Sequence, residues 1–174
     1  MREQTVQRDE PIIESRVIGE KNKILPQKSN LKVTLKKLLK SSLYGVLATQ
    51  YKSQPYTSLL AYAFTGDLRN IIFVTPQTTR KYKLLNNCKR VAFQVDNRGN
   101  SPKNIMHIES ITATGQANLI KFESPEYKSF VKLLIKRHSY LKEFIESPSC
   151  CIFSINVVRY FHVIRFQEVS EWPL

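Results

Sequence analysis

Residues 73–87, FVTPQTTRKYKLLNN, hold the densest group of side chains with a plausible chemical role. An apolar run ends in a turn, and a helical pattern begins near position 79. The turn and the first helical residues supply hydroxyls and two cations: Thr75, Thr78, Thr79, Arg80 and Lys81. Free N–H groups and the positive dipole end of a helix favour a bound anion, so the segment fits a phosphate site. It fits equally a capped amphipathic helix, with Thr78 or Thr79 as N-cap and the cations in solvent.

Motifs for other kinds of chemistry are absent from the sequence. It holds no GxGxxG, GxxxxGK[ST] or GxSxG pattern, which argues against common dinucleotide, P-loop and serine-hydrolase sites. His107, His138 and His162 are far apart and have no partners at metal-ligand spacing, so no metal site is expected. Glu109 and Glu123 are isolated carboxylates. Because no self-sufficient catalytic set is present, we expect a cofactor to supply any chemistry.

The chain is strongly basic, with a formal net charge of +13 over 174 residues. The charge is dispersed, and its densest patch, seven lysines, lies in residues 21–40, ahead of the strand-rich body. Such a potential attracts nucleic acid and phosphorylated cofactors alike. Charge alone therefore does not choose between these partners.

The cysteines and the apolar runs indicate the compartment. Cys88, Cys150 and Cys151 show no CxxC spacing, and we expect them to be reduced thiols, as in the cytoplasm. No apolar run approaches the roughly 20 residues that a membrane span needs. The first residues lack the apolar centre of a signal peptide. We therefore expect a cytoplasmic protein.

The chain divides into an N-terminal arm, residues 1–30, and one domain, residues 31–174. The arm is polar and is interrupted by Pro and Gly. The domain opens with a short helix starting around Thr34, whose apolar stripe is expected to cover one end of a sheet. That stripe consists of Leu35, Leu38 and Leu39.

The rest of the domain is mainly β. Strands are predicted at residues 44–50, 56–64, 71–75, 91–96, 108–120, 149–158 and 160–168, the last two meeting near Arg159. Helices are predicted at 79–87, at 124–137 and around 141–145. Gly115 is expected to mark a bulge or a close approach of two backbones. Consecutive strands with few helices predict a mainly β fold, a six- to seven-stranded antiparallel barrel with helices covering its ends.

Four segments in this order resemble the pyridoxamine 5′-phosphate oxidase-related family of FMN-binding split barrels. They are YGVLAT, PYTSLLAYAF, IIFVTPQTTRKYKLLNNCKRVAFQVDNR and ITATGQANLI, and the resemblance runs from about Leu35 to Trp172. It implies a split barrel, an FMN cofactor and a homodimer with FMN at the interface. Because true oxidases carry an Arg-x-His segment after the tryptophan and basic residues near Ser58 and Ala63, oxidase activity on pyridoxamine phosphate itself is not expected.

The resemblance also implies a set of cofactor-binding residues. Arg80 and Lys81 match the basic pair that holds the FMN phosphate, with Thr75 and Thr79 as hydroxyl partners. Tyr56, Thr57, Ser58 and Leu59 match the strand that lines the flavin ring and the ribityl chain. Asn97 and Arg98 are candidates for contacts across the dimer, and Trp172 resembles a tryptophan that the oxidases bring near the flavin.

Three functions remain open from the sequence. The first is an FMN-dependent oxidoreductase; Tyr62, His107 and Tyr160 are candidate proton donors, and none is favoured. The second is a barrel that binds haem, with His107 or His162 as axial ligand, or a deazaflavin. The third is a basic nucleic-acid-binding barrel that stacks bases on exposed aromatic rings. We rank it last because most aromatic residues lie in strands that are expected to be buried.

Overall fold

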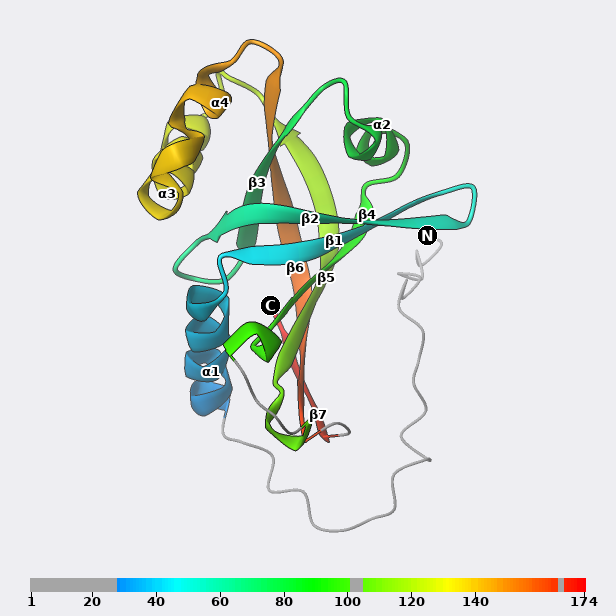
Figure 1. The fold of residues 1–174 in the computed structure, drawn as a ribbon, viewed down its shortest axis with the longest axis vertical. Coiled ribbons are helices and arrows are strands. Elements are labelled where there is room, and N and C mark those ends of the chain that lie inside the picture. Colours follow the sequence, from blue (N-terminus) through cyan, green and yellow to red (C-terminus); the bar gives the residue numbers. More distant parts are fainter. Residues whose placement is uncertain (1–27, 101–104, 166–167) are drawn as a thin grey trace, which may run out of the picture.

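Seven strands form one antiparallel sheet that closes on itself in the computed structural model, which describes residues 28–100, 105–165 and 168–174 (Figure 1). The strands are β1 (Tyr44–Tyr51), β2 (Gln54–Phe64), β3 (Asn70–Pro76), β4 (Arg90–Asp96), β5 (Ser110–Ile120), β6 (Cys150–Ile164) and β7 (Glu168–Pro173). Their order is β3-β2-β1-β4-β5-β6-β7, and β3 also pairs with β6. This pairing closes a six-stranded barrel and leaves β7 as an extra strand. The predicted antiparallel barrel is confirmed.

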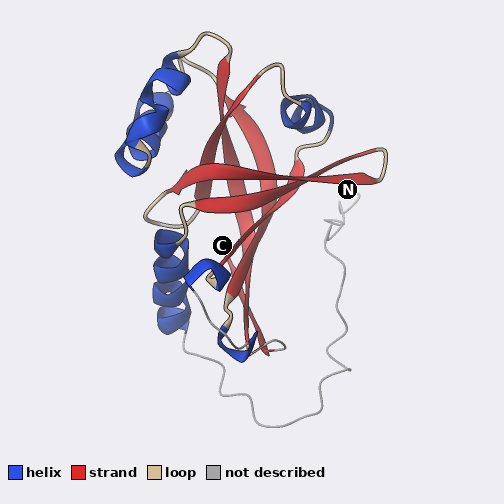
Figure 2. Cartoon of the chain, viewed as in Figure 1, coloured by secondary structure: helices blue, strands red, loops and turns tan. Residues whose placement is uncertain are grey.

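Of the four α-helices in the described part of the chain, three lie along one side of the barrel and α2 lies on the other side (Figure 2). They are α1 (Lys28–Ser41), α2 (Arg80–Asn87), α3 (Tyr127–Arg137) and α4 (Lys142–Glu146). The leucine stripe of α1 joins the cluster that fills the barrel. The α3 and α4 helices bury Phe130, Leu134 and Ile145 against Ile72 and Ile152 in a second cluster. The barrel therefore has one core inside it and another between its wall and the helices.

Two helix starts differ from the prediction. The first helix begins at Lys28 rather than near Thr34, and Leu31 extends the same buried stripe by one turn. The predicted arm thus ends inside this helix, and residues 1–27 lie outside the described residues. The helix expected from position 124 begins at Tyr127, because Ser124 and the residues after it form a turn in which Ser124 O accepts from Tyr127 N at 3.1 Å.

The last long strand is continuous, so the predicted break near Arg159 is wrong. In β6, Val157 pairs with Gly115 and Arg159 pairs with Thr114, which leaves Val158 as an extra residue opposite the partner strand. This β-bulge inverts the alternation of buried and exposed residues, which reads in the sequence like a strand end. The expectation for Gly115 is confirmed, since a Cβ there would overlap the carbonyl oxygen of Asn156.

Arg137 ties the ends of two helices together. Its Nη2 donates to the carbonyl oxygens of Leu39 and Ser42, both at 2.6 Å, at the C-terminus of α1. Its guanidinium also lies 5.0 Å from the centre of the buried Tyr62 ring. The last carbonyls of a helix have no partner within the helix. Arg137 therefore satisfies the end of α1 from the end of α3.

Candidate functional site

The barrel wall is split where β2 and β3 separate. These strands pair only between Tyr62–Phe64 and Ile71–Phe73. Beyond that point, Tyr56–Ala61 stay paired with β1, and Val74–Pro76 stay paired with β6. Within the described chain no strand covers the other edge of Tyr56–Ala61. Backbone groups on an open strand edge are available to a ligand.

The start of α2 lies beside the split, where Arg80 contacts Tyr56 of β2. Thr79 caps this helix, and its Oγ accepts a hydrogen bond from the backbone N–H of Tyr82 at 3.3 Å. The same hydroxyl donates to the carbonyl of Pro76 at 2.9 Å and lies 2.8 Å from the hydroxyl of Thr75. Since a hydroxyl has one proton, Thr75 is the donor in that last contact. The capped helix is therefore formed, and in this arrangement the two threonines shape the turn.

Two cations lie at this helix start without a negative partner in the part of the chain that the structure describes. The Arg80 side chain is exposed, and its guanidinium lies 4.9 Å from the centre of the Tyr56 ring. Lys81 is half-buried, and burial lowers the pKa of its ammonium group below the ordinary value. The first turn holds no acidic residue, and neither cation has an ion pair among the described residues. Two cations beside a helix N-terminus are an arrangement that favours a bound anion.

Strand β2 adds a buried hydroxyl that has no partner among the described residues. The Oγ of Ser58 is buried and makes no hydrogen bond within the described chain. Ser58 shares the inner side of β2 with Tyr56, whereas Thr57 and Leu59 point outward and are exposed. An unpaired buried hydroxyl is costly, so it is a common sign of a missing ligand or water. The predicted strand residues thus divide between the two sides of the wall.

A family comparison agrees with this architecture. The family model of pyridoxamine 5′-phosphate oxidase matches residues 31–164. The chain belongs to this family. The expected family is confirmed, and the match covers every strand of the closed barrel and the whole of the α2 segment.

Solved structures show the same fold at low sequence identity. A haem-binding protein from Mycobacterium smegmatis has a TM-score of 0.72 at 14% identity, with 87% of this chain and 60% of that chain covered. HutZ, the haem storage protein of Vibrio cholerae, has a TM-score of 0.65 at 12% identity over 82% of this chain and 94% of that chain. An FAD-binding protein from Mesorhizobium loti has a TM-score of 0.60 at 18% identity, with 75% of this chain and 91% of that chain covered. No curated protein matches the chain.

Three of the residues implied by the family resemblance, Asn97, Arg98 and Trp172, lie toward the Ile164 end of β6, because Asp96 pairs with Ser110 and Ser110 pairs with Val163. Trp172 pairs with Tyr160 in the sheet and stacks on its ring at 6.0 Å. Thr75 pairs with Cys151, and the distance along β6 from Cys151 to Tyr160 is roughly 30 Å at the usual rise per residue. Asn97 accepts a hydrogen bond from the backbone N–H of Glu109 at 2.9 Å. The cofactor roles of Trp172 and Asn97 stay predictions. The role of Arg98, whose Nε lies 3.2 Å from Oδ1 of Asp96, stays a prediction as well.

Two of the candidate proton donors are core residues. Tyr62 and Tyr160 are fully buried, and each donates its hydroxyl to a backbone carbonyl at 2.8 Å. Burial raises the pKa of both phenols. Neither group is accessible to a substrate in this structure, so both serve the core.

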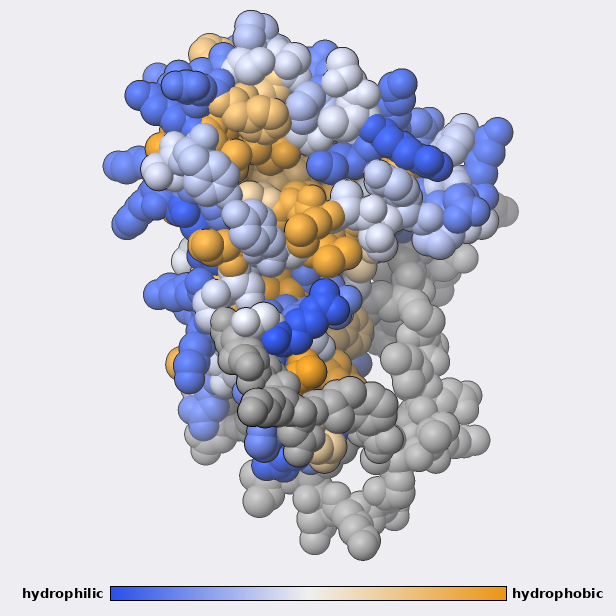
Figure 3. Space-filling model, viewed as in Figure 1, coloured by the Kyte–Doolittle hydropathy of each residue, from blue (hydrophilic) through white to orange (hydrophobic). Residues whose placement is uncertain are grey.

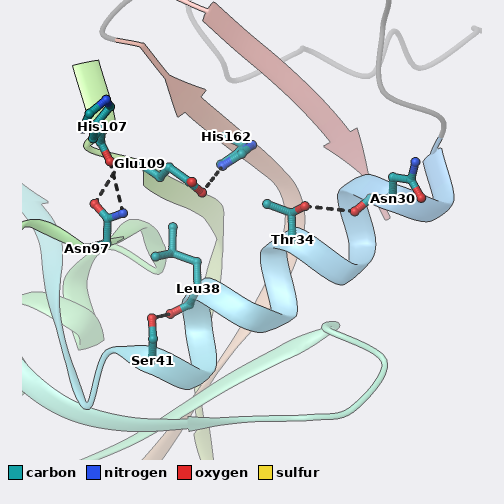
Figure 4. A network of polar contacts seen from close by, with 8 residues as sticks. All are labelled: Asn30, Thr34, Leu38, Ser41, Asn97, His107, Glu109 and His162. Atoms are coloured by element: carbon teal, nitrogen blue, oxygen red, sulfur yellow. Dashed lines mark hydrogen bonds and ion pairs between the residues drawn. The ribbon is translucent and has the colours of Figure 1, made fainter. Parts of the chain in front are cut away.

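The three histidines differ in burial and in hydrogen-bond partners. Figure 4 shows His162, which is buried, with its Nε2 3.4 Å from a carboxylate oxygen of Glu109. His138 is also buried, and both of its ring nitrogens have partners, Tyr62 O and the hydroxyl of Tyr140. His107 is exposed. In the described part of the chain no group of three His, Cys, Asp or Glu residues is placed to hold a metal.

Three side-chain features were not foreseen from the sequence. These are the contact of Tyr56 with Arg80, the unpartnered hydroxyl of Ser58 and the role of Arg137. Each depends on a pairing between distant segments, and no local pattern signals it. A surface hollow of about 590 Å³ beside Tyr127 and Cys150, on the outer side of β5 and β6, was likewise unforeseen. None of the predicted site residues lines that hollow.

In the described chain no helix is long and apolar enough to cross a membrane.

Proposed function

We propose that this protein binds FMN in the split between β2 and β3 and acts as a flavin-dependent oxidoreductase. The FMN phosphate would lie at the start of α2, between Arg80 and Lys81. The flavin would extend along the open edge of β2, where Ser58 offers a hydroxyl. Bound FMN supplies hydride or electron transfer. The chain's own task is to hold the phosphate and to limit access to the ring.

The observation that carries this proposal is the convergence of three unpaired features on one opening. Among the described residues they are two cations without a counter-ion, a strand edge without a partner and a buried hydroxyl without a hydrogen bond. A phosphorylated, planar cofactor with polar ring edges satisfies all three. Charge-assisted hydrogen bonds from Arg80 and Lys81 to a phosphate are among the stronger polar contacts in proteins.

The test is a titration of the purified protein with FMN, read by flavin fluorescence and absorbance. Arg80→Ala/Lys81→Ala should weaken FMN binding at least tenfold, because each charged hydrogen bond contributes about 1.5–3 kcal/mol. The matched control is Lys83→Ala/Lys89→Ala, which removes the same charge from two exposed positions nearby. Equal affinity in the two double variants would contradict the assignment of the basic pair.

The same proposal includes a homodimer. On the outer side of β1 and β2, Leu59 is 68% exposed and Tyr44 is 49% exposed. Figure 3 shows apolar surface gathered over this part of the molecule. Exposed apolar patches of this kind mark association surfaces. Sedimentation should show a dimer that Leu59→Glu dissociates, whereas Val33→Glu, at an equally exposed position on α1, should leave it intact.

A second candidate is haem binding. Two of the structural neighbours named above bind or store haem, and His107 offers an exposed imidazole. His162, the other predicted axial ligand, is buried beside Glu109. Incubation with FMN, FAD, haem and a deazaflavin, followed by spectra and melting curves, separates the candidates, since a ligand of the folded state raises its stability. A Soret band lost in His107→Ala would favour haem.

A further inference from the structure

We infer that Tyr56 is a positioning residue, which holds the Arg80 guanidinium ready for the cofactor phosphate. This inference rests on the proposed function and adds a role that the family resemblance does not give, since the resemblance places Tyr56 along the flavin. The carrying observation is the stack of the guanidinium over the Tyr56 ring at 4.9 Å. A cation over an aromatic face is attracted to the electrons of the ring.

Arg80 needs such a support because nothing else in the described chain fixes it. Its side chain is exposed and has no carboxylate partner there. A long side chain of this kind samples many rotamers, and ordering it on binding reduces affinity. The Tyr56 ring restrains the guanidinium without neutralising its charge, as a carboxylate would. The cation therefore stays available to a phosphate.

Tyr56 is itself held in place by the hydrogen-bonded β1–β2 hairpin. Tyr56 pairs with Thr49 across the β1–β2 hairpin, and the Thr49 hydroxyl donates to the Tyr56 carbonyl at 3.1 Å. The hairpin turns through two residues with positive φ, Lys52 at 48° and Ser53 at 63°. Two such residues form the type I′ turn, whose twist matches that of the paired strands and fixes their register. The defined register of this hairpin therefore places the Tyr56 ring beside α2.

The inference predicts an effect confined to the phosphate end of the ligand. Tyr56→Leu should weaken FMN binding roughly two- to fivefold, the usual contribution of one such contact. It should leave the affinity for riboflavin, which lacks the phosphate, unchanged. Tyr56→Phe keeps the ring and should bind both ligands as the unsubstituted protein does. In an Arg80→Ala background, Tyr56→Leu should have no further effect on FMN.

The matched control is Tyr51→Leu, since Tyr51 is a tyrosine of the same hairpin with a lysine 5.5 Å from its ring centre. Tyr51→Leu should change neither affinity. Equal losses of FMN and riboflavin in Tyr56→Leu would overturn the inference and assign the ring to the flavin instead. An unchanged FMN affinity in Tyr56→Leu would overturn it too. Failure of the unsubstituted protein to bind FMN would overturn the proposed function, and this inference with it.

Discussion

Replacing Ser58 with alanine should change stability and ligand affinity in opposite directions. The Ser58 hydroxyl is buried without a hydrogen-bond partner in the described chain, and such a group costs about 1–3 kcal/mol of folding free energy. Alanine removes the hydroxyl and leaves only a small void. We expect Ser58→Ala to raise the free energy of unfolding of the ligand-free protein by about 1 kcal/mol. For a chain of this size that corresponds to a rise in Tm of about 2–4 °C.

The same substitution should weaken FMN binding. A hydroxyl that bonds the cofactor contributes about 0.5–1.5 kcal/mol, which corresponds to roughly a two- to tenfold increase in Kd. Urea denaturation without ligand measures the first effect, and fluorescence titration with FMN measures the second. Opposite signs are the signature of a group that folding leaves unsatisfied and a ligand satisfies.

Ser154 provides the control. Its hydroxyl is also buried, but it donates to the side-chain oxygen of Asn70 at 3.0 Å. Ser154→Ala should therefore lower the free energy of unfolding by about 1 kcal/mol and leave FMN affinity unchanged. If Ser58→Ala destabilised the protein to the same extent and bound FMN normally, the reasoning from the unpartnered hydroxyl would be refuted.

Three further predictions concern charge. Arg137→Ala should lower the free energy of unfolding by about 3 kcal/mol in urea denaturation, since two short charged hydrogen bonds are lost, whereas the exposed neighbour Lys136 should tolerate alanine. Because burial lowers the pKa of Lys81 below 10.5, the FMN Kd should increase with pH before that value is reached, and Lys81→Arg should remove this increase. Over the same window the unfolded chain holds the lysine proton, so the ligand-free protein should gain stability from this group as pH rises. Burial, together with the charge of Arg137, lowers the pKa of His138 below 6.5. Below that pH the unfolded chain binds more protons than the folded chain, so the free energy of unfolding should fall as the pH is lowered. Urea titrations should show this fall, and it should be less steep in His138→Gln.

The fold was largely predictable because strand patterns in this chain are locally consistent. The apolar run before Thr75 and the capped start of α2 were recognisable from residue types alone. The break predicted near Arg159 failed because an extra residue in one strand produces the same loss of alternation as a strand end. Only the partner strand distinguishes a bulge from an end, and the sequence of β6 does not contain its partner.

The site was predictable only in part, for a related reason. The cations of α2 follow one another in the sequence, so their joint role was visible there. The Tyr56 ring reaches Arg80 only through the β1–β2 register, and the lack of a partner for the Ser58 hydroxyl depends on which groups the fold places around it. Such relations depend on tertiary pairing and have no local signal. The roles of Asn97, Arg98 and Trp172 remain predictions that depend on a second copy of the chain.

The pairing that closes the barrel also determines when this protein can fold. Asn70 pairs with Asn156, so β3 meets its second neighbour only after most of the chain has been synthesised. Contacts between such distant residues slow folding. Until then β3, whose Ile71–Val74 are buried in the finished barrel, presents an open apolar edge. Such edges are prone to pair with other chains. Expression at low temperature or with chaperones should therefore increase the soluble yield, and truncation before β6 should give aggregates.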